Sequence, residues 1–112
     1  MKTTKAQFNT FKAEIHRLKD KWGMSDTNIQ IYHKDLCGSA AQMEHFSNGR
    51  VSISLATKIG EGFEHDPIRL ARHEFMHALL SQYAHLAESR YVTQDQLIGA
   101  EEAVCRMAEV GL

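Results

Sequence analysis

The chain is organised around the stretch Leu70-Ala-Arg-His73-Glu74-Phe-Met-His77-Ala-Leu-Leu-Ser-Gln-Tyr-Ala-His-Leu86. Good helix formers run through it without interruption, and Asp66-Pro67 supplies an N-cap followed by proline at the first helical position. The pattern therefore predicts a helix from Pro67 to about Glu88. Residues four apart lie on the same face of a helix, so His73 and His77 are expected to direct both imidazoles at one point.

Glu74 lies between these histidines and completes the pattern His-Glu-x-x-His. Two imidazoles on one helical face form a two-ligand metal seat, for which Zn²⁺ is the expected ion. Bound zinc lowers the pKa of water to about 7, and a neighbouring carboxylate then accepts its proton. The motif predicts His73 and His77 as zinc ligands and Glu74 as the general base. The alternative interpretation is two structural histidines that happen to flank a glutamate.

The length and composition of the chain predict one soluble globular domain over residues 1–112. Hydrophobic residues make up 43% of the chain and charged residues 24%, and there is a single proline. These are ordinary proportions for a folded domain. The formal net charge of −1 gives no electrostatic footprint for nucleic acid or for an anionic membrane.

The cysteine count and the N-terminal sequence predict a cytoplasmic protein with reduced thiols. Only Cys37 and Cys105 are present, which is too few for a disulfide scaffold, and a bridge between them is the less favoured alternative. No apolar run approaches the roughly 20 residues that cross a bilayer, and the first residues lack the apolar core of a signal peptide.

Hydrophobic periodicity predicts an α+β fold. Apolar residues at spacings of three and four predict a helix over residues 4–22, ended by Gly23. Strands are expected at 28–34, 39–46 and 51–57, the last two joined by a hairpin turn at Asn48-Gly49. We expect these strands to form a meander in a largely antiparallel sheet. A final helix is expected over about 93–110, with the motif helix packed between it and the sheet.

Three protein ligands plus water are usual at a catalytic zinc, so a third ligand is needed. The motif with a third histidine requires Gly and His at positions 80 and 83, where this chain has Leu and Tyr, so that class is excluded. The downstream candidates are His85, Glu88, Glu101 and Glu102. His65, Tyr83 and Tyr91 are candidates to stabilise an oxyanion, but inert surface or packing roles are favoured for all three.

The His73-Glu74-x-x-His77 motif and the later stretch Gly99-Ala-Glu101-Glu102-Ala-Val resemble the gluzincins, and most closely the smallest single-domain members among short phage and bacterial metallopeptidases. These are zinc peptidases whose third ligand is a glutamate on a helix after the motif helix. The resemblance covers the C-terminal half and the order helix, sheet, helix, helix. It implies a minimal zincin-like fold, His73 and His77 as ligands, Glu74 as base, and Glu101 or Glu102 as third ligand.

Helical geometry favours Glu101 over Glu102 as that ligand. At about 100° per residue, Glu101 falls inside an apolar arc formed by neighbouring turns, whereas Glu102 falls on the solvated side. A carboxylate inside an apolar stripe is costly unless it is paired or bound to a cation. Glu102 stays the alternative, because in some larger gluzincins a small residue follows the ligand, as Ala103 follows Glu102.

The function predicted from the sequence is zinc-dependent hydrolysis of peptide bonds in a peptide or protein substrate. The substrate is expected to lie in extended form along a sheet edge. Two alternatives stay open at this point. One is a protein-binding or accessory module that keeps the zincin core, and the other is a domain in which zinc supplies folding free energy alone.

Overall fold

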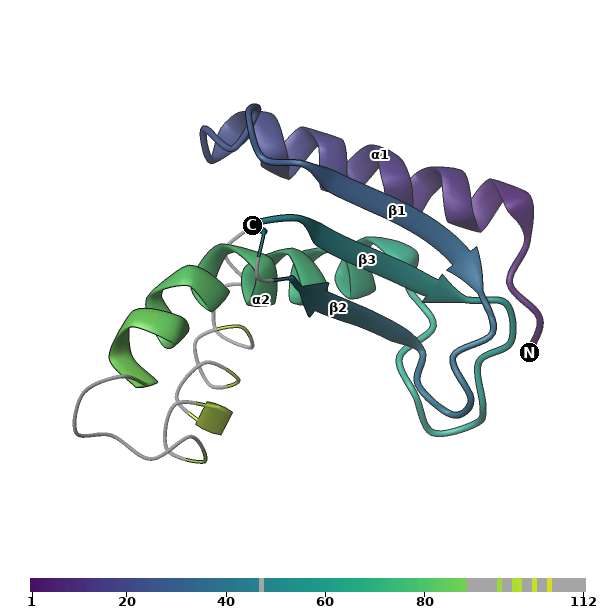
Figure 1. Ribbon diagram of the computed structural model, residues 1–112. Helices are drawn as coiled ribbons and strands as arrows, with labels where there is room; N and C mark the ends of the chain where they lie inside the picture. The colour runs from purple at the N-terminus through teal and green to yellow at the C-terminus, as the bar shows by residue number, and fades with distance from the viewer. Residues whose placement is uncertain (47, 89–94, 96–97, 100–101, 103–104, 106–112) are drawn as a thin grey trace.

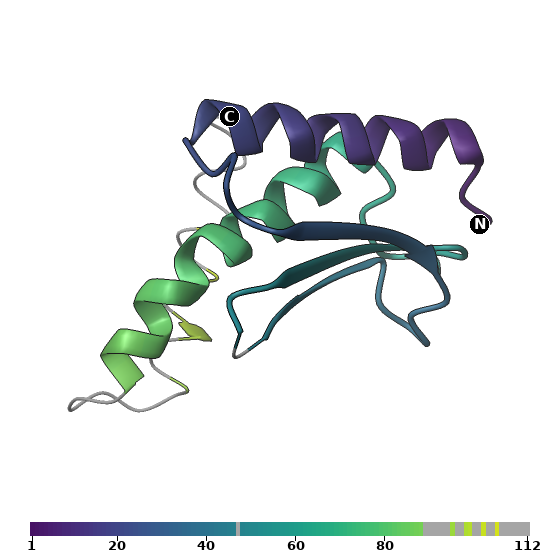
Figure 2. The same cartoon turned by 45° about the horizontal axis from the view of Figure 1, so that its top comes forward.

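The computed structural model describes residues 1–46, 48–88, 95, 98, 99, 102 and 105 (Figure 1). Within these residues lie two helices and one three-stranded sheet, which confirms the predicted α+β class. Along the chain the elements are α1 (Lys5–Lys21), β1 (Ile29–Lys34), β2 (Ala41–His45), β3 (Val51–Ala56) and α2 (Pro67–Glu88). Both helices lie on the same side of the sheet (Figure 2).

Helix α1 begins and ends close to the residues predicted from the sequence. Thr4 caps it: the Thr4 hydroxyl accepts from the Gln7 N–H at 3.1 Å, and the Gln7 side chain accepts from the Thr4 N–H at 2.8 Å. Such a reciprocal pair satisfies two backbone donors that a helix start otherwise leaves open. Gly23 follows the last turn with φ +68°, a left-handed conformation that glycine adopts without steric cost.

The buried face of α1 carries the residues that the 3.6-residue period singled out. Phe11, Ile15 and Leu18 are each 0% exposed and belong to the hydrophobic core. Phe8 packs at the edge of this core, where its ring stacks on the His33 imidazole of β1 at 4.9 Å between centroids. This contact places α1 over the core-facing side of the sheet.

The three strands form as predicted, but their arrangement differs from the expected meander. The strand order is β1-β3-β2, with β1 parallel to β3 and β2 antiparallel to β3. The sheet is therefore mixed, and the expectation of a largely antiparallel meander was wrong. All six residues of β3 are buried, so this strand takes the central place with a partner on each side. Alternation of apolar residues shows that a strand exists but not which strand lies beside it.

The hairpin between β2 and β3 is confirmed. Phe46 N–H donates to the Arg50 carbonyl at 2.9 Å, and Arg50 N–H donates to the Asn48 side chain at 3.0 Å. Gly49 has φ +87°, which the turn requires and which explains the Asn-Gly pair. The turn leaves β2 at one edge of the sheet.

Helix α2 spans Pro67–Glu88, as the sequence predicted. Asp66 is its N-cap, because the Asp66 carboxylate accepts from the Ile68 N–H at 3.0 Å. Ala71, Phe75 and Ala78 are at most 1% exposed and join the core beneath the sheet and α1. Among the described residues, no helix is long and apolar enough to cross a bilayer.

Most of the predicted final helix, 93–110, lies outside the described residues. Five positions within that range are described, and each has helical conformation: Asp95, Ile98, Gly99, Glu102 and Cys105. Cys105 is fully buried and Cys37 is exposed, and no disulfide joins them. The prediction of two unbridged cysteines is therefore confirmed.

An ion-pair cluster around one buried carboxylate joins α1 to α2. Glu14 on α1 is only 9% exposed, and its carboxylate accepts from Arg17 at 2.6 and 2.9 Å and from Arg72 of α2 at 2.7 Å. The hydrogen bond from Arg17 is the largest influence on the Glu14 carboxyl. With Arg72 it holds the pKa of that carboxyl below the ordinary 4.5, although burial acts in the opposite direction.

The lowered pKa of Glu14 predicts a loss of stability in acid. A carboxyl whose folded pKa lies below its unfolded pKa contributes stability above the unfolded value, and this is lost as pH falls through the folded value. We expect Glu14→Gln to flatten the acid side of the pH profile of the unfolding free energy. The change in slope is at most about 1.4 kcal/mol per pH unit, because one proton is involved. Urea titrations at several pH values below 5 measure it, and an unchanged slope would contradict the prediction.

Candidate metal centre

His73 and His77 lie one turn apart on α2 and direct their rings at a common point, as the motif predicted. Their Nε2 atoms are 3.1 Å apart, and the rings meet edge to face at 4.8 Å between centroids. The side chains are 26% and 16% exposed, so one side of the pair stays open to solvent.

Glu102 supplies a carboxylate at the same point. Its Oε1 lies 2.5 Å from Nε2 of His77, and its Oε2 lies 3.5 Å from Nε2 of His73. Glu102 was the alternative third ligand in the sequence prediction. Helical geometry predicted that its side chain faces solvent. In the structure its carboxylate is directed at the imidazoles, while 37% of the side chain is exposed. Glu101, the favoured candidate, lies outside the described residues.

The three side chains fit a zinc ion in donor chemistry, and their ligand atoms lie close enough together to share one ion. Two imidazoles and one carboxylate are a known donor set of catalytic zinc, which leaves the fourth position for water or substrate. Bonds of about 2.0–2.1 Å place tetrahedral ligands roughly 3.3 Å apart. The two separations from Nε2 of His73, 3.1 Å to His77 and 3.5 Å to Glu102, bracket that value, whereas Oε1 of Glu102 and Nε2 of His77 lie closer together, at 2.5 Å. One ligand atom from each of the three residues lies within 4.8 Å of the others.

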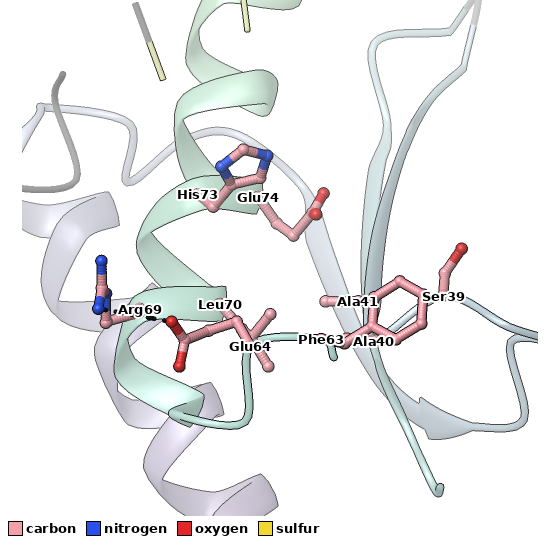
Figure 3. Close-up of a pocket in the computed structure, with 9 residues that line it drawn as sticks. All are labelled: Ser39, Ala40, Ala41, Phe63, Glu64, Arg69, Leu70, His73 and Glu74. Atoms are coloured by element: carbon pink, nitrogen blue, oxygen red, sulfur yellow. Dashed lines mark ion pairs between the residues drawn. The ribbon is translucent and has the colours of Figure 1, made fainter. Parts of the chain in front are cut away.

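Glu74 points to a different side of α2, toward the sheet. Its side chain is 9% exposed and, together with His73, lines a hollow between α2 and the start of β2 (Figure 3). In Figure 3 the Glu74 carboxylate extends toward Ala41 on β2. The predicted base Glu74 and the predicted ligand His73 therefore line the same hollow.

The hollow has a volume of about 390 Å³. Apolar groups form much of its wall: Ala40 just before β2, Ala41 at the start of β2, Phe63 of the loop before α2, and Leu70 of α2. No motif or spacing in the sequence marks these four residues as site residues. Two adjacent alanines do not by themselves indicate a pocket. They line one here because the sheet order puts β2 at the edge of the sheet, where it contacts α2.

The loop before α2 is held by its own hydrogen bonds. Glu64 accepts from the backbone N–H groups of His65 and Asp66 at 3.1 and 3.0 Å and pairs with Arg69 at 3.5 Å. His65 contacts the Gly60 carbonyl through Nε2 at 3.1 Å. This contact joins His65 to an earlier residue of the same loop. Tyr91 and the side chain of Tyr83 lie outside the described part of the structure.

Comparison of the chain with protein-family models, with curated proteins and with solved structures gives no match. The assignment of a function therefore rests on the motif and on the geometry of this site.

Proposed function

We propose that the protein is a zinc-dependent peptidase of the gluzincin type, with a minimal zincin-like domain. The observation that carries this proposal is the convergence of His73, His77 and Glu102 on one point, beside a hollow lined by Glu74. The order of ligands along the chain, two histidines on one helix and a later glutamate, is the order that the motif resemblance implies.

His73, His77 and Glu102 are the residues proposed to hold the metal. Zinc bound there supplies a Lewis acid that polarises a carbonyl oxygen and acidifies water. Glu74 accepts the proton of the attacking water and later donates it to the leaving amine. Its burial beside apolar side chains limits solvation of the carboxylate by bulk water.

The hollow gives the substrate its place. Among the described strands, β2 pairs with β3 alone, so its outer edge offers backbone donors and acceptors to an extended peptide. A peptide added along this edge passes the wall formed by Ala41 and Glu74. A substrate side chain then occupies the space between Phe63 and Leu70, whose apolar surfaces favour an apolar residue.

Elemental analysis combined with a cleavage assay tests the proposal. The purified protein is expected to retain one zinc ion per chain and to cleave an unstructured substrate such as casein. A zinc chelator is expected to stop the cleavage, and added zinc to restore it. Zinc without cleavage would instead support a binding module or a structural zinc. A protein that binds no zinc would contradict all of these functions.

A further inference from the structure

We infer that Glu14 and Arg72 are positioning residues that fix the rotation of α2 and thereby the aim of its metal-binding histidines. This inference rests on the proposed function, because it concerns the geometry of the proposed zinc site. Arg72 directly precedes His73 in the chain, and its Nε donates to Glu14 on α1 at 2.7 Å. The ion pair thus connects the helix that bears the histidines to a second, independent element.

The hydrogen bonds of this cluster oppose rotation of α2 about its own axis. Glu14 is 9% exposed, and its two carboxylate oxygens are both engaged by Arg17 of the same helix. Arg17 therefore fixes the orientation of the carboxylate, and the carboxylate fixes Arg72. Hydrogen bonds to a buried carboxylate are directional, whereas the apolar contacts between the two helices are not.

Helix geometry converts this contact into a constraint on the imidazoles. Around the helix axis His73 is turned by about 100° from Arg72, and His77 by about 140°. An imidazole nitrogen some 5–6 Å from the axis moves by about 2 Å when the helix rotates by about 20°. Zinc–nitrogen distances tolerate changes of only about 0.2 Å, so a small rotation is enough to spoil the site.

The opposite charges of the two residues give a sharp test. Arg72→Met removes a positive charge near the site, which by itself would strengthen the binding of a cation, and Glu14→Gln removes a negative charge, which by itself would weaken it. A positioning role predicts that both changes weaken zinc binding, by about tenfold each in chelator competition. It also predicts that the double variant is no worse than either single one, because both remove the same contact.

Two control variants separate positioning from stability. Ile15→Val and Leu18→Val each trim the core face of α1 without removing a member of the Glu14, Arg17 and Arg72 cluster. Both are expected to lower the unfolding free energy of the metal-free protein but to leave the zinc Kd within about twofold of wild type. The absorption spectrum of bound Co²⁺ reports ligand geometry, and it is expected to change in Arg72→Met and Glu14→Gln but not in the controls.

The outcomes are distinguishable. If wild type binds zinc and the Glu14 and Arg72 variants bind it equally well with an unchanged cobalt spectrum, this inference is wrong and the proposed function stands. Zinc affinities that move in opposite directions in these two variants would show a charge effect and overturn it too. If Arg72→Met fails to fold, Arg72→Lys keeps the charge but loses the planar fork, and it must also weaken binding. A wild-type protein that binds no zinc refutes the proposed function together with this inference.

Discussion

Glu74→Gln is expected to abolish peptide hydrolysis while zinc stays bound. The amide has nearly the shape of the carboxylate, so it keeps the packing of a side chain that is 9% exposed beside His73. It has no site that accepts the proton of the attacking water. Loss of general base catalysis lowers rates by about 10²- to 10⁴-fold, which takes a slow peptidase below detection. The measurement is casein cleavage, with zinc content determined on the same preparation.

His73→Ala is the comparison for this variant, because it removes a ligand and is expected to lose both zinc and activity. A protein that keeps its zinc but not its activity thus isolates the role of Glu74. Full activity of Glu74→Gln in an assay that a chelator inhibits would show that another group takes the proton.

Glu102→Gln is expected to weaken zinc binding by about a hundredfold or more, because it replaces a charged ligand at the convergence point of the two imidazoles. Titration against a competing chelator measures the Kd. The structure carries this expectation, since the carboxylate of Glu102 lies within 2.5 Å of His77 and 3.5 Å of His73.

Glu101→Gln provides a matched control, because it makes the same chemical change at the neighbouring position. Helical geometry read from the sequence ranks Glu101 first, whereas the structure places Glu102 at the site. We expect the Glu101 variant to bind zinc nearly as well as wild type. A stronger loss in Glu101→Gln than in Glu102→Gln would return the assignment to Glu101.

Local signals in the sequence predicted the elements of the fold well. The Asp66-Pro67 start of α2, the Gly23 stop after α1 and the Asn48-Gly49 turn each act through the conformation of a few neighbouring residues. The order of the strands was not predictable in this way. It depends on which strand is buried on both faces, and the small residues Ser52 and Ser54 become buried only because β3 has neighbours on both sides.

The site residues likewise differ in whether local sequence is enough to predict them. His73, Glu74 and His77 are predictable because one helix fixes their spacing. The proposed third ligand comes from a segment distant in sequence from the motif. Neighbouring residues of a helix point about 100° apart. An error of one residue in the assumed rotation of that helix is therefore enough to exchange the predicted directions of Glu101 and Glu102. The apolar wall at Ala40, Ala41 and Phe63 was invisible for a related reason, because it exists only where a loop and a strand edge meet α2.

The central place of β3 also separates two strand pairings that differ in the length of chain each one closes. Partners in the β2–β3 hairpin, such as His45 and Val51, are close in sequence, whereas each β1 residue pairs across 22 positions, as Ile29 does with Val51. Closing a loop costs about 0.6 kcal/mol more for each doubling of its length. The hairpin is therefore the half of the sheet with the lower cost of closure. Because β2 borders the hollow, the strand edge proposed to receive substrate belongs to this local half, and the distant pairing of β1 lies on the other side of β3.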